Sequence, residues 1–366
     1  MLKLRRALVR EVVTDAGAAE QSLLVELADE PAVRRAAIAD SALVGHTEVG
    51  DEVIVNVQAL DLGLGSGGFD IVHANLTRGL RADGFDGAHV MKLNYSSLQH
   101  AVEPVERGEQ LRLPLRRPVA VLALHGQLAP LAWAFAQAAP GRALGYVQTE
   151  GGALPAARSR VAAELRRRGL LARHVSAGAA FGSESEAITT AGALHAGLDE
   201  LGWDAAVCGP GPGIVGSASA LGHGGMFALD SAHTAIALGC PTVLVARMSS
   251  ADPRPRHRGL SHHTRSVLEL LLVPAIVALP QRDDTEPQGV RDSPRLARHY
   301  WPRFDTDLDG FAASGLPAET MGRGAVDDPL FFEAALAAGA AMASLALEPA
   351  VENDALPEGD DAPARW

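Results

Sequence analysis

Short alternating patterns of apolar and polar residues characterise the first third of the chain. Gly50-Asp51 is a turn sequence that leads into the Val/Ile alternation of residues 52–57, a combination common in small closed barrels. The other ranges with strand-like patterns are 2–13, 21–27, 32–38, 69–74 and 88–93. Residues 105–117, which contain glycine and proline, read as a linker. The pattern predicts a small β-barrel-like domain over residues 1–115.

The period changes at Pro118. Residues 119–124 form a continuous apolar run, as expected for a strand buried on both faces, and a helical pattern follows over 129–138. Further strands are expected at 143–148, 172–176, 205–208, 242–246 and 275–279, and helices at 155–168, 184–201, 227–238, 263–272 and 329–347. This alternation predicts a doubly wound, mostly parallel, Rossmann-like α/β domain over 118–347. The acidic tail, 348–366, is expected to be disordered.

Composition and charge narrow the class of partner. The chain has 366 residues and a formal net charge of −12, so its surface is expected to repel nucleic acid and anionic membranes. The apolar run over 267–279 is interrupted by Glu269 and Pro274, which argues against a membrane span. Cys208 and Cys240 belong to no CxxC pair, and the N-terminus has no signal-peptide pattern. We therefore expect reduced, buried cysteines and a cytoplasmic location.

Ligands of open parallel sheets bind beyond the carboxyl ends of the strands, which directs attention to the loops there. His125 follows the first strand of the α/β domain and Glu150 follows the second. If these strands are neighbours, the two side chains form an acid/base pair across the crevice. Alternatively, each one only hydrogen-bonds loop backbone, as buried polar groups require.

A glycine-rich loop, residues 209–216, follows the fourth strand. It contains the letters GxGxxG, but a dinucleotide site requires the first strand and a suitably placed acid. An anion cradle formed by Gly211, Gly213 and Ser217 fits better, and a rigid loop without a ligand is the alternative. No cofactor follows from this loop.

Residues 256–264 combine arginines, histidines and hydroxyls. Arg256 and Arg258 suggest a carboxylate or phosphate ligand, and Ser261 and Thr264 either contact that ligand or cap the next helix. His262 and His263 are acid/base candidates. Because adjacent residues of a helix point about 100° apart, both side chains rarely bind one metal ion, and no metal site is predicted. The alternative is an arginine-rich surface loop with one capping histidine.

Other polar residues receive structural interpretations. His223 and His233 are expected to have structural roles. Glu184 and Glu186 are expected to begin a helix, where their negative charges interact favourably with the helix dipole. The glycine-rich segment 61–68 lies between two strands and is read as a mobile loop over the crevice or a plain hairpin turn.

Four motifs together resemble one family. They are the glycines of residues 63–68, the segment 149–152, the loop 209–216 and the segment 256–264. The chain is similar over residues 1–347 to a bacterial family, found mainly in high-GC Gram-positive species, that is classed as a domain of unknown function. The resemblance implies a shared fold and carries over no activity, substrate or catalytic residue.

Three functional hypotheses follow. The leading one is an enzyme acting on a small anionic or phosphorylated metabolite at the carboxyl edge of the parallel sheet. The second is a sensor or scaffold that binds such a metabolite without transforming it. The third is a structural oligomer subunit, in which the alanine-rich helix 331–346 forms an interface between copies; a homodimer is compatible with all three.

Overall fold

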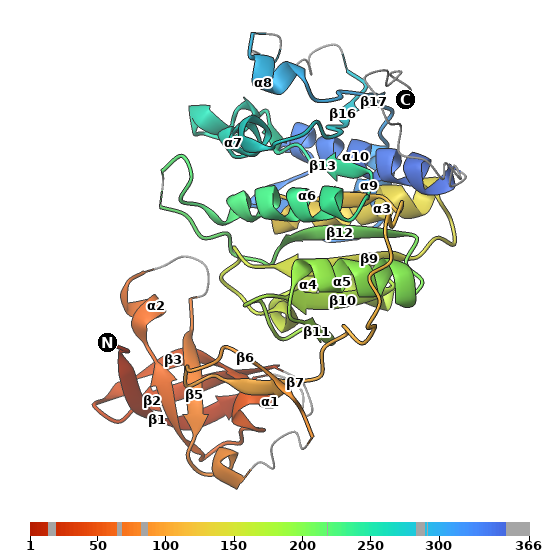
Figure 1. The fold of residues 1–366 in the computed structure, drawn as a ribbon. Helices are drawn as coiled ribbons and strands as arrows, with labels where there is room; N and C mark the ends of the chain where they lie inside the picture. The colour runs from red at the N-terminus through yellow and green to blue at the C-terminus, as the bar shows by residue number, and fades with distance from the viewer. Residues whose placement is uncertain are drawn as a thin grey trace.

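A closed barrel forms the N-terminal part of the computed structural model, which describes residues 1–13, 20–63, 68–81, 87–217, 219–282, 290 and 292–348 (Figure 1). Its strands are β1 (Leu4–Val12), β2 (Glu20–Leu27), β3 (Glu30–Asp40), β4 (Glu52–Asn56) and β5 (Asp70–Asn75). They close in the order β1-β2-β3-β5-β4, and all pairs are antiparallel except β3 with β5. The expected barrel is confirmed. The expected loop over 61–68 and the tail beyond 348 lie largely outside the described residues.

The interior of the barrel follows from alternation along its strands. Every second residue of β2 is buried, and Val53 and Val55 of β4 are fully covered. The short helices α1 (Ser41–Val44), α2 (Gln58–Asp61) and η1 (Gly79–Arg81) lie beside these strands, and β6 (Val90–Lys92) pairs with β7 (His100–Val102) as a hairpin. From β7 the chain leads through residues 103–118 into the α/β part.

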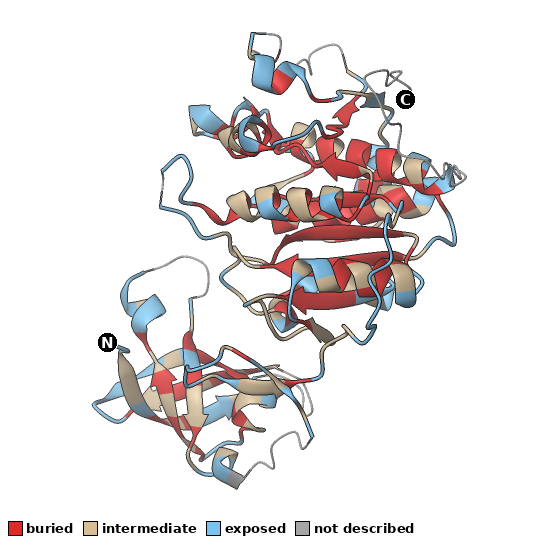
Figure 2. Ribbon diagram, in the orientation of Figure 1, coloured by how far each residue is buried: buried red, intermediate tan, exposed pale blue. Residues whose placement is uncertain are grey.

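A six-stranded parallel sheet is the centre of the α/β part. Its order is β11-β10-β9-β12-β8-β13, with strands β8 (Val119–Val121), β9 (Leu144–Thr149), β10 (Arg173–Ala177), β11 (Ser185–Ala187), β12 (Ala205–Pro210) and β13 (Thr242–Leu244). Strands β9 and β12 are buried at every residue, as Figure 2 shows, because helices cover both faces. The doubly wound Rossmann-like fold is confirmed.

The helices divide between the two faces of the sheet. Helices α3 (Leu128–Ala138), α4 (Arg160–Arg167) and α10 (Pro329–Leu347) contribute to one apolar core. Helices α5 (Thr190–His195), α6 (Phe227–Ala237) and α7 (His262–Leu270) contribute to the other. Shorter elements complete this part: η2 (His125–Gln127), η3 (Ala156–Arg158), η4 (Ala196–Glu200), η5 (Gly224–Met226), η6 (Pro255–His257), α8 (Pro294–Ala297), α9 (Leu308–Ala313), β14 (Met248–Ser249), β15 (Gly259–Leu260), β16 (Leu279–Pro280), β17 (Arg303–Phe304), β18 (Glu319–Thr320) and β19 (Arg323–Gly324).

Two expected elements differ from the structure. The helix expected over 184–201 begins only at Thr190, because residues 185–187 pair with β10. Thr189 is the N-cap residue of this helix, and its side chain accepts a hydrogen bond from the Gly192 N–H. The interpretation of Glu184 and Glu186 as first-turn residues is therefore wrong. The sheet strand expected over 275–279 meets β13 only at Ile276, because the backbone of this segment also bonds to residues 300 and 302.

Helix α10 has the expected bounds and is part of the core. By length and composition it is apolar enough to cross a membrane, yet 72% of that window is buried inside the fold, which is typical of the core helix of a soluble protein. Gly339 lets it approach α3 closely: a Cβ there would lie 2.4 Å from the carbonyl oxygen of Leu131. Most of the apolar surface of α10 is therefore used inside the chain, and an interface between copies at this helix stays a prediction.

Candidate functional site

The adjacent strands β9 and β12 send the chain to opposite faces of the sheet. After β9 the chain enters α4, whose Leu165 belongs to one core, and after β12 it enters α6, whose Ala232 belongs to the other. Such a reversal opens a crevice at the carboxyl ends of the strands, where doubly wound folds bind ligands. The loops after β9 and β12 are therefore the first place to look for a site.

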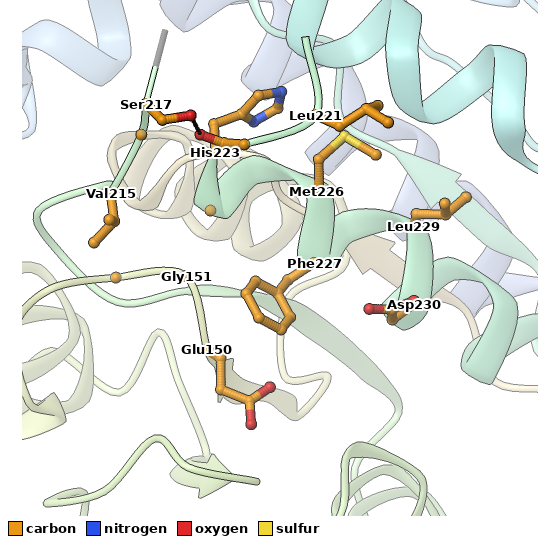
Figure 3. Close-up of a pocket in the computed structure, with 14 residues that line it drawn as sticks. Glu150, Gly151, Val215, Ser217, Leu221, His223, Met226, Phe227, Leu229 and Asp230 are labelled. Atoms are coloured by element: carbon orange, nitrogen blue, oxygen red, sulfur yellow. Dashed lines mark hydrogen bonds between the residues drawn. The ribbon is translucent and has the colours of Figure 1, made fainter. Parts of the chain in front are cut away.

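A cleft of about 760 Å³ lies between these two loops. The β9 loop contributes Glu150, Gly151 and Gly152, and the segment leading into α6 contributes the rest: Val215, Gly216, Ser217, Leu221, Gly222, His223, Gly224, Met226, Phe227, Leu229 and Asp230. In Figure 3 the Phe227 ring lies between Glu150 at one end and His223 at the other. The cleft thus has an apolar middle with carboxylates and an imidazole around it.

Close backbone contact holds the two loops together. A Cβ on Gly224 would lie 2.0 Å from the carbonyl oxygen of Gly151, so no other residue fits without displacing the loop. The backbone N–H of Val215 donates to the Gly151 carbonyl at 3.1 Å, and that of Ala153 donates to Gly213 at 2.7 Å. The N–H of Val215, in the loop expected to form an anion cradle, is therefore used to hold the two loops together.

The predicted cradle residues take different positions. Ser217 lines the cleft, and its Oγ donates to the Gly222 carbonyl at 3.1 Å (Figure 3). Gly211 and Gly213 serve the loop packing: the Gln148 side chain lies against Gly211, and Gly213 has a φ of +77°, which favours glycine.

Four histidines gather at one end of the cleft. His223 comes from the β12 loop, His257 from η6, and His262 and His263 from the first turn of α7. The rings of His223 and His263 stack with centroids 3.7 Å apart, and those of His262 and His263 are 4.4 Å apart at 73°. His257 lies 4.8 Å from His262. The histidine cluster joins segments about forty residues apart in sequence.

Two members of the histidine cluster have buried ring nitrogens without hydrogen-bond partners among the described residues. These are both nitrogens of His223 and Nε2 of His262. The Ala220 backbone lies near enough to His223 to raise its pKa, but this contact does not reach normal hydrogen-bond geometry. An unsatisfied buried polar group costs about 1–3 kcal/mol, so these nitrogens mark the histidine cluster as a candidate binding site.

All four imidazoles are held in the neutral form. Burial is the main cause and lowers the pKa of His262 to about 4 and that of His257 to about 3. Burial likewise lowers the pKa of His223 and that of His263. The positive charges of Arg247 and nearby arginines act in the same direction.

Arginines and buried carboxylates surround the histidine cluster. Arg247 is only 3% exposed, and its Nη1 donates to Nδ1 of His263 at 2.8 Å. Asp252 is fully buried and pairs with Arg254 at 2.8 Å, with Arg323 at 3.4 Å and with Arg247 at 3.5 Å. The hydrogen bonds from Arg254 are the main cause that keeps the pKa of Asp252 far below its usual range.

A second buried carboxylate, Asp328, adds to this network. It accepts from Ser249 Oγ at 2.6 Å and from Arg323 at 3.2 Å. Together Asp252 and Asp328 supply two negative charges against Arg247, Arg254 and Arg323, so these five groups sum to a positive charge.

The remaining predicted residues of segment 256–264 have identifiable roles. Ser261 caps α7: its Oγ accepts from the His263 N–H, and it also bonds Nδ1 of His257 at 2.8 Å. Thr264 Oγ1 accepts from the Arg247 N–H at 2.9 Å, and the Arg258 side chain donates to the Asp252 carbonyl at 3.0 Å. These residues support the histidine cluster, while Arg256 contributes charge to it.

His125 and Glu150 are engaged by different partners. His125 bonds Tyr146 and the Pro210 carbonyl through Nδ1, each at 3.2 Å, and Ser159 Oγ through Nε2 at 2.7 Å. Glu150 accepts from the Ala179 N–H at 2.8 Å and lines the cleft. His125 thus links the sheet to the start of α4, and the acid/base pair that the sequence suggested is not assembled.

Two groups among the described residues have metal-ligand composition. Ligand atoms of His223, His262 and His263 lie within 4.8 Å of one another, and so do those of His195, Asp199 and Glu200. In the second group, Nε2 of His195 accepts from the Arg112 N–H and Asp199 pairs with the Arg112 side chain. Only the first group combines convergence with unpartnered buried nitrogens.

Acidification is expected to destabilise the protein between pH 7 and pH 5. Burial lowers the pKa of His125 to about 4 and that of His174 to about 3, against an ordinary value of 6.5. Below pH 6.5 the unfolded chain therefore binds more protons, and each such histidine costs about 1.4 kcal/mol per pH unit. This stability is complete above pH 7 and is lost as the pH falls.

Melting temperatures measured from pH 8 to pH 5 test this expectation. The midpoint should be level above pH 7 and fall below pH 6.5, with a shallower fall in a His174→Gln variant. A midpoint that stays constant or rises between pH 7 and pH 5 would contradict it.

Sequence reasoning missed several residues of this site. His223 was interpreted as structural, and His257 and Arg247 were not singled out, although both lie in or next to the arginine-rich segment. The only available signal was position: His223 stands in the loop after β12, directly before η5.

Comparison with known families supplies one match. A family model described as a protein of unknown function (DUF3866) matches residues 36–339, from within β3 to within α10. The match therefore includes both the cleft and the histidine cluster. No curated protein and no solved structure matches the chain.

Proposed function

The chain belongs to the DUF3866 family of proteins of unknown function, as its four motifs suggested, and we propose from the site itself that it is an enzyme acting on a small anionic metabolite. A phosphorylated compound is the expected class. The cleft between the β9 and β12 loops is the binding site in this proposal, and the histidine cluster is its polar end.

The position and size of the cleft support this proposal. It lies at the carboxyl edge of a doubly wound sheet, where such folds bind small molecules. Its volume of about 760 Å³ suits a metabolite, since small-molecule sites typically measure about 300–1,000 Å³. The apolar side chains of Met226 and Phe227 would cover the less polar part of the ligand.

The observation that carries the proposal is the pair of unpartnered histidines beside arginines. Both ring nitrogens of His223 and Nε2 of His262 are buried and have no hydrogen-bond partner among the described residues. Arg247 and Arg256 lie close enough to lower the pKa of both histidines. Phosphate and carboxylate oxygens accept from N–H groups and are attracted by guanidinium charge, so an anion fits this end of the cleft.

The residues then take separate roles. His262 and His263 are the proposed acid/base groups, with His223 beside the ligand, and Arg256 neutralises ligand charge. Ser217 and Glu150 line the cleft and are proposed to orient the ligand. Arg258, Ser261 and Thr264 act indirectly, because their side chains hold the loops that position the histidines.

A thermal-shift screen of the full chain with phosphorylated and carboxylated metabolites tests the proposal. A ligand at a hundred times its dissociation constant stabilises by about 2.7 kcal/mol, which raises the melting midpoint by roughly 5–10 °C. We expect His262→Ala and Arg256→Ala to abolish the shift. The control Arg10→Ala, on the exposed face of the barrel, should keep it. If no anion stabilises the protein, or if both site variants respond like the wild type, the proposal is wrong.

A non-catalytic sensor or scaffold is the second candidate. The observation that favours it is the separation of His125 from Glu150, since each is held by other groups. Incubating each stabilising compound with the protein and analysing the products distinguishes the two functions. Turnover that disappears in His262→Ala supports the enzyme, and binding without product supports the sensor.

We also propose a cytoplasmic location, which agrees with two free cysteines, both buried. A homodimer remains a prediction that sizing at several concentrations can test.

A further inference from the structure

The hydrogen-bonding needs of His223 exceed what an anion can satisfy. A neutral imidazole carries one N–H and one lone pair, and neither nitrogen of His223 has a hydrogen-bond partner among the described residues. The unprotonated oxygens of an anion accept from the N–H but donate nothing to the lone pair. His223 is only 9% exposed, so a proton donor or a metal ion is the partner that this lone pair lacks.

Three histidines bring ring nitrogens into one small volume. The ligand atoms of His223, His262 and His263 lie within 4.8 Å of one another, and Nε2 of His262 is also buried without a partner. We infer that these three histidines bind a divalent transition metal of the zinc class, in which case they are its ligands and the metal takes the place of the acid/base role proposed above for His262 and His263. Three imidazoles with an open fourth position form a known arrangement of catalytic zinc, and His223 places that open position beside the cleft.

The site has supports that fit a metal centre. Ser261 caps the helix that carries His262 and His263, which fixes the backbone of both ligands. His257 lies 4.8 Å from His262, with its Nδ1 bonded to the same Ser261 side chain. The buried carboxylates of Asp252 and Asp328 offset part of the arginine charge that would otherwise repel a cation.

Binding requires local rearrangement. Nitrogens bound to one tetrahedral zinc ion lie roughly 3.4 Å apart, given Zn–N distances of about 2.0–2.1 Å, so the rings must approach by about an ångström. The stacked rings of His223 and His263, 3.7 Å apart, must turn so that their lone pairs converge. Arg247 must release Nδ1 of His263, and Asp252, 3.5 Å from its guanidinium, is the carboxylate that can retain it.

Metal binding can be measured without any organic ligand, so its outcome is independent of the proposed function. The full chain is stripped with a chelator, titrated with Co²⁺ or Zn²⁺, and analysed by visible absorption and by metal content after dialysis. We expect about one ion per chain, with the absorption of tetrahedral Co²⁺. The ion should also raise the melting temperature.

Single substitutions assign the ligands. His262→Ala and His223→Ala are each expected to weaken Zn²⁺ binding by at least about 100-fold, since even indirect supports of a metal are worth about 10–100-fold. His89→Ala, at an exposed histidine of the N-terminal region, is the matched control and should bind like the wild type. His262 is partly exposed, so its variant remains informative if His223→Ala does not fold. Less than about 0.2 ions per wild-type chain, or unchanged binding in His262→Ala, would overturn the inference and leave water as the partner of these nitrogens.

Discussion

Replacing Asp252 with asparagine is expected to lower the free energy of unfolding by about 3–5 kcal/mol, the cost of leaving a buried charge without its partner. Asp252 is fully buried and is the common partner of Arg247, Arg254 and Arg323. Arg247 is nearly as buried, and this burial, together with the charges of the other arginines, already lowers its pKa to about 10. An uncharged amide at position 252 would leave these arginines to repel one another around His263.

Chemical denaturation followed by circular dichroism measures this change, which corresponds to a fall in melting midpoint of roughly 6–20 °C. Asp29→Asn is the matched control, because Asp29 pairs with Arg5 at 3.0 Å on the surface, where an ion pair contributes at most about 1 kcal/mol. A loss below 1 kcal/mol in Asp252→Asn would mean that Asp328 alone compensates the arginines. The network would then not be the support of the histidine cluster described above.

The elements that sequence patterns predicted well are those whose environment is local or uniform. Residues 119–124 are continuously apolar because β8 is covered on both faces, and helix 329–347 has the predicted bounds because the structure buries it along most of its length. The closed barrel also followed from alternation, as Val53 and Val55 show. Where burial alone sets the pattern, sequence therefore predicts the element.

The errors occur where long-range contacts decide the structure. Glu186 looks like a first-turn helix residue, but the Lys92 side chain, almost a hundred residues earlier in the chain, binds it beside β10. Likewise, the sequence places His223 in a loop, and the path of that loop is fixed by contacts with the β9 loop, among them the close approach of Gly224 to Gly151. His262 and His263 are adjacent on one helix, but His223 approaches both of them from another segment. No local pattern contains this information.

The second large effect is expected at Lys92, where the β6–β7 hairpin meets the edge of the parallel sheet. Its ammonium group is buried and donates to the Glu186 carboxylate at 2.6 Å, to the Ala180 carbonyl at 2.6 Å and to the Ser176 carbonyl at 3.0 Å. Lys92→Met keeps a long side chain but leaves all three acceptors without this donor. We expect a loss of about 3–5 kcal/mol, as for other broken buried ion pairs.

The double variant Lys92→Met, Glu186→Gln separates the ion pair from simple packing. The double variant should recover part of the stability lost in Lys92→Met, because the Glu186 carboxylate is no longer left buried without its partner. The double-mutant cycle should give a coupling energy above about 1 kcal/mol. Lys3→Met is the control: Lys3 is the other lysine of the chain, and its partner Asp61 is also bonded by Arg35. If Lys92→Met and Lys3→Met have equal, small effects, Lys92 does not hold the hairpin to the sheet. If the loss is large, the contact between Lys92 and Glu186 holds β11 in position. This contact would then explain why residues 185–187 form a strand instead of the helix that their sequence suggests.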